Sequence, residues 1–255
     1  MSEQLAKFSN GWRLAAAAVV FALLGGVAGW YWQANNGLGS GPASLAAGDR
    51  KAIEQVVRDY ILAHPEILPE AMEKLQQRES AKQLAGVQNA VETPFPGAVL
   101  GNPGGSVTLV EFSDFACGYC RQSEADVAAL IAANPDLRVV IRQLPILSAE
   151  STDAAKMGLA AARQGKYAAF HHAMYAAGRP DAATIEAAAR VAGLDLARAR
   201  QDIADRAITG EIERNLQFAR QLGFNGTPSW VVGEEIHAGA VGREVLAEAI
   251  AKARG

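Results

Sequence analysis

The stretch that decides the fold is Val107–Cys120, VTLVEFSDFACGYC. Its first six residues, Val107–Phe112, are rich in β-branched and aromatic side chains, which is typical of a buried strand. Arg121–Ala133 then has a helical pattern that ends before Pro135. The tetrapeptide Cys117-Gly118-Tyr119-Cys120 therefore lies where a strand passes into a helix. Free backbone N–H groups and the helix dipole favour a thiolate at such a junction.

A thiolate at this junction is suited to disulfide exchange. Cys117 would attack, and Cys120, one turn into the helix, would resolve the mixed disulfide. Two other readings have less support. A zinc site needs about four ligands, whereas the chain has two cysteines and four histidines without helpful spacing. A purely structural disulfide here would close too small a loop to stabilise much. The residues predict no metal and no cofactor.

The order of elements around this junction predicts the fold class. A second strand is expected at Leu137–Leu144, and a long helical region follows over residues 149–222, interrupted at glycines and Pro180. Residues 229–238 are typical of a hairpin and 241–251 of a final helix. Strand, helix, strand, several helices, hairpin and helix predict an α/β thioredoxin-like fold with a helical insertion after its second strand.

The N-terminal segment differs from the rest of the chain. Leu14–Trp32 has no charged residue, and at about 1.5 Å per residue it would span about 28 Å, the thickness of a bilayer core. Lys7 and Arg13 precede it, which favours a cytoplasmic N-terminus. We expect an uncleaved transmembrane helix; a cleaved signal peptide or a buried soluble helix are the alternatives.

The remaining boundaries follow from composition. Residues 1–32 form the N-terminus with its anchor or signal, 33–48 a flexible linker, 49–93 a helical extension that could mediate oligomerisation, and 94–255 the thioredoxin-like domain. In the extension, helices are expected on either side of His64-Pro65, since proline disfavours helix in the residue before it. An apolar stripe is expected on the first helix, made by Ile53, Val56, Val57, Tyr60 and Ile61.

The charge balance excludes one class of partner. The chain has 24 basic and 27 acidic residues and a net charge of -3. Nucleic-acid-binding proteins usually carry a basic excess, so we expect no nucleic acid.

Two motifs resemble a known family. VEFSDFACGYC resembles the active-site strand and turn of the DsbA family of thiol–disulfide oxidoreductases, and Gly226–Trp230, GTPSW, resembles its cis-proline loop. The resemblance covers about Ala98–Ala251. In addition, YILAHPEILPEAMEKLQQRE, within Asp49–Val91, resembles the N-terminal extension of the ScsC-type members.

The resemblance implies further roles. Pro228 would be cis and face the cysteines, while Thr227 would offer its backbone to an extended substrate; Gly118 and Tyr119 would also contact substrate. Glu111, a carboxylate in an apolar strand, would lie beneath Cys120 and accept its proton, unless the strand turns it outward into solvent.

Three other polar positions are assigned from the sequence. We expect Asp114 to cap the following helix. Of His171 and His172, we expect one to pack in the interior and one to be solvated.

The residues between the cysteines are Gly-Tyr, whereas the best-known oxidase of the family has Pro-His. The histidine beside the thiolate of that oxidase is therefore missing here, and strong oxidising power is not expected.

The resulting expectation is an enzyme that forms, reduces or isomerises disulfides in exported proteins. Its partners would be exported proteins with thiols or disulfides, a membrane redox partner, and further copies in a homodimer or homotrimer. It would be a single-pass inner-membrane protein with its catalytic domain in the periplasm or outside the cell, or a periplasmic protein after signal cleavage. The alternatives are a redox-active copper-handling or assembly module and a chaperone-like structural protein.

Overall fold

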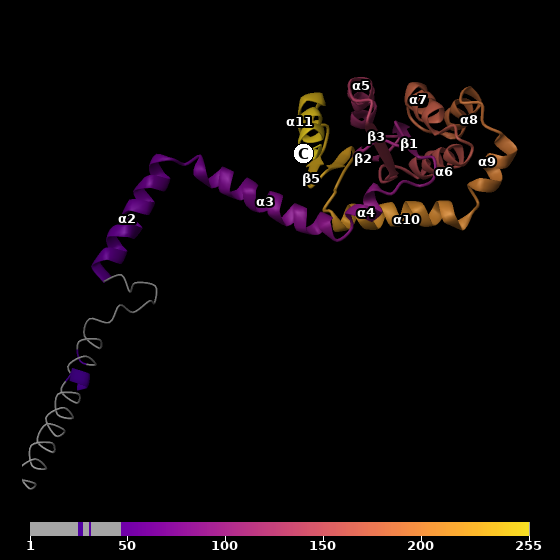
Figure 1. Ribbon diagram of the computed structural model, residues 1–255. Helices are drawn as coiled ribbons and strands as arrows, with labels where there is room; N and C mark the ends of the chain where they lie inside the picture. Colours follow the sequence, from indigo (N-terminus) through magenta and orange to yellow (C-terminus); the bar gives the residue numbers. More distant parts are fainter. Residues whose placement is uncertain (1–24, 28–30, 32–46, 255) are drawn as a thin grey trace, which may run out of the picture. The chain divides into compact units, whose positions relative to one another are not determined.

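The computed structural model describes residues 25–27, 31 and 47–254, in two compact units divided between Ile67 and Leu68. Each unit is described by itself (Figure 1). Of the apolar run Leu14–Trp32, only Gly25–Val27 and Tyr31 are described, so the expected anchor lies outside the described residues. Among the residues that are described, no helix has both the length and the apolar character that crossing a membrane requires.

The first unit contains the helix α2, Ala47–Ala63, which ends at the predicted interruption before His64-Pro65. Its apolar stripe is exposed. Ile53, Val56, Val57 and Tyr60 are between 47% and 67% exposed. Apolar side chains arranged on one helix face are stabilised when another surface covers them, and none of the described residues of this unit covers these four.

The second unit is built on a five-stranded sheet in the order β1-β3-β2-β4-β5. Its central strands β2 and β3 are parallel, and the other neighbouring pairs are antiparallel. The strands are β1 Val99–Gly101, β2 Val107–Ser113, β3 Leu137–Gln143, β4 Ser229–Val232 and β5 Glu235–Ala238.

The second unit also contains helices. They are α3 Ile67–Ala85, α4 Gln88–Glu92, α5 Gly118–Ala133, α6 Ala149–Arg163, α7 Tyr167–Ala177, α8 Ala182–Val191, α9 Leu196–Asp202, α10 Arg206–Gln221 and α11 Arg243–Ala253. Helices α6 to α10 form the insertion between β3 and β4. The predicted thioredoxin-like α/β fold with a helical insertion is confirmed.

The central strand β2 is buried on both faces of the sheet. Successive side chains of a strand point to opposite faces, and the core accordingly divides in two. Leu109 belongs to the cluster that includes Cys120 of α5, whereas Val110 and Phe112 belong to the cluster that includes Phe218 of α10. Figure 1 shows α5 and α11 on one side of the sheet and α10 on the other. Alternation places Glu111 on the α5 side, with Leu109.

A buried arginine attaches the segment before β1 to the sheet. Arg142 of β3 is 1% exposed and forms an ion pair with Glu211 of α10 at 2.6 Å. It also donates hydrogen bonds to the carbonyls of Val91, at 3.0 Å from Nε, and of Ala90 and Thr93. The second half of the 49–93 extension, from Leu68, is thus part of the same compact unit as the thioredoxin-like domain.

Candidate active site

Cys117 is the N-cap residue of α5, and its sulfur accepts a hydrogen bond from the backbone N–H of Cys120 at 3.4 Å. The Cys117 N–H in turn donates to the Asp114 carbonyl at 2.9 Å, which fixes the turn between β2 and α5. Both thiols are free, and both cysteines are buried. The pair therefore lies at the junction of strand and helix that the sequence predicts.

The loop before β4 meets the cysteine pair. The Thr227-Pro228 peptide bond is cis, as the resemblance implied. The Cys117 thiol donates to the Thr227 carbonyl at 3.1 Å, across 110 positions of sequence. The Ser229 hydroxyl donates to the Gly226 carbonyl at 2.8 Å and holds the loop. The fold thus brings Cys117, Cys120 and Thr227-Pro228 to one place.

The two thiols have opposite acidities. The hydrogen bond from the Cys120 thiol is the main cause that lowers the pKa of Cys117 to about 5. Burial opposes it, and the Thr227 side chain and the Cys120 and Tyr119 N–H groups lower the pKa further. Burial raises the pKa of Cys120 far above its usual range, and its hydrogen bond to Cys117 acts in the same direction. A thiolate at Cys117 and a thiol at Cys120 are the states expected at neutral pH.

Glu111 lies inside the protein and not in solvent. It is 1% exposed, and neither of its carboxylate oxygens has a hydrogen-bond partner among the described residues. Burial raises its pKa to about 8; the neighbouring Ser113 hydroxyl opposes this, and the negative charges of Glu124 and Cys117 add to the effect. The Glu111 charge also raises the pKa of Cys120, so the carboxyl group is electrostatically coupled to the thiol whose proton it was predicted to take.

The expected helix-capping role of Asp114 is wrong. Its buried carboxylate accepts hydrogen bonds from the N–H groups of Ala116 at 2.8 Å, Ile146 at 2.9 Å and Leu147 at 3.0 Å. Cys117 caps α5 instead. The carboxylate is taken up by backbone donors of its own turn and of the loop after β3, so it ties that loop to the active-site turn.

The residues around the cysteines include several exposed groups. Gly118 begins α5 and is exposed, and the Tyr119 side chain is 64% exposed. Ile146 and Leu147 are 42% and 53% exposed. The prediction for the histidines is confirmed, because His171 is fully buried while the His172 side chain is 60% exposed. Both imidazoles hydrogen-bond to the carboxylate of Glu124 on α5, a residue without a recognisable signal in the sequence.

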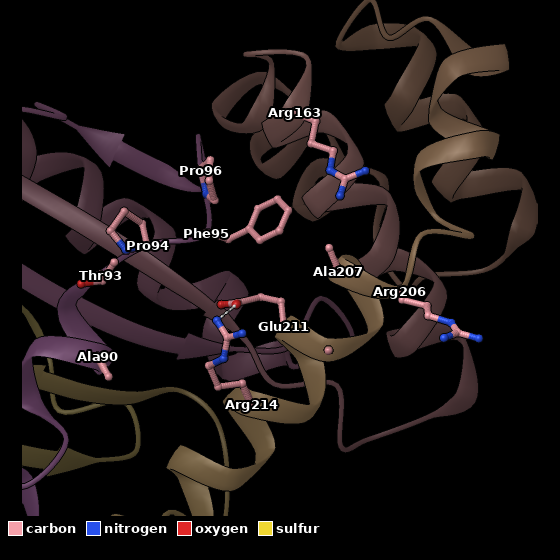
Figure 2. A pocket seen from close by; sticks show the side chains of 11 residues that line it. Ala90, Thr93, Pro94, Phe95, Pro96, Arg163, Arg206, Ala207, Glu211 and Arg214 are labelled. Atoms are coloured by element: carbon pink, nitrogen blue, oxygen red, sulfur yellow. Dashed lines mark hydrogen bonds and ion pairs between the residues drawn. The ribbon is translucent and has the colours of Figure 1, made fainter.

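A separate pocket contains neither cysteine, and two of its three arginines form ion pairs. Figure 2 shows Arg163 near Phe95 and Arg214 beside Glu211, whereas the Arg206 side chain points away from them. Arg163 forms ion pairs with Asp202 and Asp205, at 3.0 and 2.9 Å, and Arg214 with Glu211 at 2.9 Å. We assign this pocket no binding role. Within the described part of the chain, no three histidine, cysteine or acidic side chains are grouped to hold a metal ion.

Comparisons with known proteins agree with this geometry. The family model described as DSBA-like thioredoxin domain matches residues 108–251, and that of the copper resistance protein ScsC N-terminal domain matches residues 49–82. A thioredoxin-like oxidoreductase from Silicibacter pomeroyi DSS-3 is 43% identical, with a TM-score of 0.59 over 61% of this chain and 91% of that one. A linker-deletion mutant of Proteus mirabilis ScsC is 26% identical, with a TM-score of 0.64 over 84% and 99% of the two chains.

Curated relatives match over a shorter part. The Na(+)/H(+) antiporter NhaA 3 of Salinispora tropica is 35% identical over 152 residues, which are 58% of this chain and 23% of the antiporter. The chain spans about a quarter of the length of the curated relatives it matches. The DSBA-like model covers more than half of the chain and includes both cysteines and the cis-proline loop. The chain therefore belongs to the DsbA-like thioredoxin family, and its fold is that of DsbA- and ScsC-type thiol–disulfide oxidoreductases.

Proposed function

We propose that this protein catalyses thiol–disulfide exchange on exported proteins, with Cys117 as the attacking thiolate and Cys120 as the resolving thiol. The observation that carries the proposal is the position of Cys117 at the N-terminus of α5, with its sulfur bonded to the Cys120 N–H and beside the Thr227 carbonyl. Hydrogen-bond donors at this position stabilise a thiolate, which is the nucleophile in disulfide exchange.

In the reductive direction, the Cys117 thiolate attacks one sulfur of a substrate disulfide. The substrate S–S bond breaks, one substrate sulfur leaves as a thiolate, and a mixed disulfide forms. Cys120 then transfers its proton to Glu111 and attacks the Cys117 sulfur, which releases the second substrate thiolate. The substrate gains two electrons and the protein is left with a Cys117–Cys120 disulfide. Oxidation of a substrate follows the same steps in reverse.

The proton acceptor in this scheme must be ionised yet basic enough to take a thiol proton. Glu111, whose pKa burial raises to about 8, is ionised in a minor fraction of molecules near neutral pH, and in that form it is basic enough to take a thiol proton. Its carboxylate oxygens lack other partners among the described residues, so one is available for the proton. Glu111 is therefore the proposed proton acceptor for Cys120.

Substrate recognition is proposed to combine backbone and apolar contacts. The Thr227 backbone would pair with an extended chain once its carbonyl is released by the Cys117 thiol, and Gly118 and Tyr119 are exposed beside the attacking sulfur. Ile146 and Leu147 add exposed apolar surface on the loop that Asp114 holds against the active-site turn. Unfolded polypeptides present both backbone and apolar side chains, so we propose them as substrates.

The segment before the catalytic domain, residues 1–93, is proposed to place and assemble it. The exposed stripe of α2 supports self-association into a dimer or trimer, since apolar faces of this kind are covered in stable assemblies. Joined active sites would act on one substrate at high effective concentration and favour isomerisation. The apolar run Leu14–Trp32 supports a membrane anchor with the catalytic domain in the periplasm or outside the cell, where a membrane redox partner would reset the cysteines.

Two measurements test these proposals. The soluble part from Gln33 should reduce insulin, and a Cys117→Ser variant should not. Light scattering should give a dimer or trimer for this part, and a monomer for a chain that starts at Leu68, where the second compact unit begins. Insulin reduction that survives loss of Cys117 would refute the catalytic proposal. If both chains are monomers, the assembly proposal is refuted and the extension acts as a spacer.

A copper-handling module is the second candidate, because the match to residues 49–82 carries the description of a copper resistance protein. Cuprous ion prefers soft thiolate ligands, and the two cysteines would have to supply them. Titrating the reduced protein with cuprous ion, with and without both cysteines, separates the candidates. Tight cysteine-dependent binding without insulin reduction would favour the copper module.

A further inference from the structure

The loop before the cis-proline contains an asparagine followed by a glycine, Asn225-Gly226. The pair lies between the end of α10 and the start of β4, with Asn225 exposed and Gly226 half-buried. The Gly226 carbonyl accepts the hydrogen bond from Ser229. The Gly226 N–H and the Asn225 side-chain amide form no hydrogen bond with any described residue, so neither group is held away from the other.

An asparagine followed by a glycine can lose its side-chain amide without an enzyme. The backbone nitrogen of the glycine gives its proton to solvent base and attacks the side-chain carbon Cγ. Ammonia leaves, and the new C–N bond closes a five-membered succinimide ring. Water then opens the ring on either side, which leaves aspartate or isoaspartate. The reaction consumes one water, releases one ammonia and transfers no electrons. Glycine favours the attack because it has no Cβ to hinder the approach.

The other asparagines of the described residues lack one of these conditions. Asn102 and Asn134 precede prolines, whose backbone nitrogen carries no proton to lose. Asn215 is 1% exposed, and both polar atoms of its side chain are hydrogen-bonded. Asn89 is in the helix α4 and is followed by an alanine. Within the described part of the chain, exposure, a free amide and a following glycine therefore coincide at Asn225.

The product would form beside the attacking sulfur. Two residues after Asn225, the Thr227 carbonyl accepts the hydrogen bond from the Cys117 thiol at 3.1 Å, and two residues of backbone span at most about 7 Å. A new carboxylate here places a negative charge near a sulfur that reacts as a thiolate, and like charges oppose ionisation. Isoaspartate also lengthens the main chain by one methylene, which displaces the Thr227 carbonyl.

We propose that Asn225-Gly226 is a site of spontaneous deamidation, and that the aspartate or isoaspartate it produces slows disulfide exchange at Cys117. The first part concerns the chemistry of the loop alone. The second part rests on the proposed exchange function, because it concerns the attacking step of that reaction. The loop that meets the nucleophile thus has a chemical lifetime of its own.

The test for the modification incubates the reduced full chain at mildly alkaline pH and follows it by peptide mapping with mass spectrometry. The same dipeptide occurs at residues 10–11 and 36–37, outside the described residues, so the map must resolve all three. Asn225 should convert with time, whereas Asn102 and Asn134 should not. Gly226→Ala is the matched control: its Cβ would meet no atom within 4 Å, and Gly226 has no positive φ. It should slow the conversion severalfold.

The test for the consequence measures insulin reduction during the same incubation, with each protein referred to its own rate before incubation. The wild-type rate should fall in step with the converted fraction, and Gly226→Ala should keep its rate. Asn225→Gln, whose longer side chain would have to close a six-membered ring, is a second protected variant should Gly226→Ala not fold. Asn225→Asp carries the product charge and should raise the pKa of Cys117, read by alkylation, by roughly half a unit.

Two results would overturn the first part: an Asn225 that stays intact, or conversion at the same rate in Gly226→Ala and Asn225→Gln. A converted protein that keeps its full rate, or a loss of rate that the protected variants share, would overturn the second part. If fresh protein does not reduce insulin while Asn225 converts as expected, the proposed function fails and the modification stands.

Discussion

Replacing Glu111 with glutamine should stabilise the folded protein, by an amount that increases with pH. In the folded state the carboxyl group is 1% exposed and has no hydrogen-bond partner among the described residues. Burial keeps it protonated up to a pKa of about 8, whereas its ordinary pKa is 4.5. Glutamine has nearly the same shape but cannot ionise, so it never requires a charge in this position.

The size of the effect follows from proton linkage. Between pH 4.5 and about 8 the unfolded chain has released the Glu111 proton and the folded protein still holds it. The unfolded state therefore binds fewer protons, and the free energy of unfolding falls by about 1.4 kcal/mol for each pH unit in this window. At pH 7 the wild type should be less stable than Glu111→Gln by about 3 kcal/mol. Below pH 4.5 the difference should vanish.

Urea unfolding followed by circular dichroism, at intervals from pH 4 to pH 9, measures this difference. Both proteins should be fully reduced. The same comparison in a Cys117→Ser, Cys120→Ser background removes the two thiols that also titrate in the site. A difference that stays constant across the pH range would refute the assignment of a raised pKa to Glu111. A Glu111→Gln protein that is less stable than wild type at pH 8 would refute the argument that the buried charge is unfavourable.

Three further predictions concern the cysteines and the core. Cys117→Ser should abolish exchange, whereas Cys120→Ser should accumulate mixed disulfides visible on non-reducing gels; equal trapping by both variants would contradict the assigned roles. Alkylation of Cys117 in the reduced protein should rise with a midpoint near pH 5, and a midpoint near 9 would contradict the hydrogen-bonded thiolate. Arg142→Met should lower the free energy of unfolding by about 3–5 kcal/mol, because Oε1 of the buried Glu211 loses its 2.6 Å partner, although Oε2 keeps Arg214, and because the Val91 carbonyl loses its donor. Arg138→Met, which loses one hydrogen bond to Thr108, should cost about 1 kcal/mol.

Most of the fold could be predicted because its signals are local. The apolar run of β2, the glycines between α6 and α9 and the proline after α2 each mark a boundary within a few residues of sequence. The strand β1 was missed for the opposite reason. Its three residues, Val99–Gly101, are too few to show a pattern, and they are a strand only because β3 pairs with them.

The same distinction applies to the site. Cys117, Cys120 and Thr227-Pro228 stand in motifs that can be recognised from the sequence alone. The roles of Asp114, Glu124 and Arg142 depend on partners 32 to 73 positions away. Asp114 precedes a helix and so matches the pattern of a cap, but its carboxylate binds the distant N–H groups of Ile146 and Leu147. A short-range pattern cannot distinguish these two uses of one carboxylate.

The dipeptide between the cysteines can now be weighed against the rest of the site. Gly-Tyr lacks the histidine of Pro-His, and this argued against a strongly oxidising pair. Yet the pKa of Cys117 is lowered by the Cys120 thiol and by groups at Thr227 and the first turn of α5, none of which is the Tyr119 side chain. A thiol of low pKa is present as a thiolate, which stabilises the reduced form of the protein and so favours oxidation of the substrate. The missing histidine therefore removes only one of several contributions to oxidising power. Tyr119→His should lower the Cys117 pKa further, while Tyr119→Ala, which leaves those hydrogen bonds in place, should not change it.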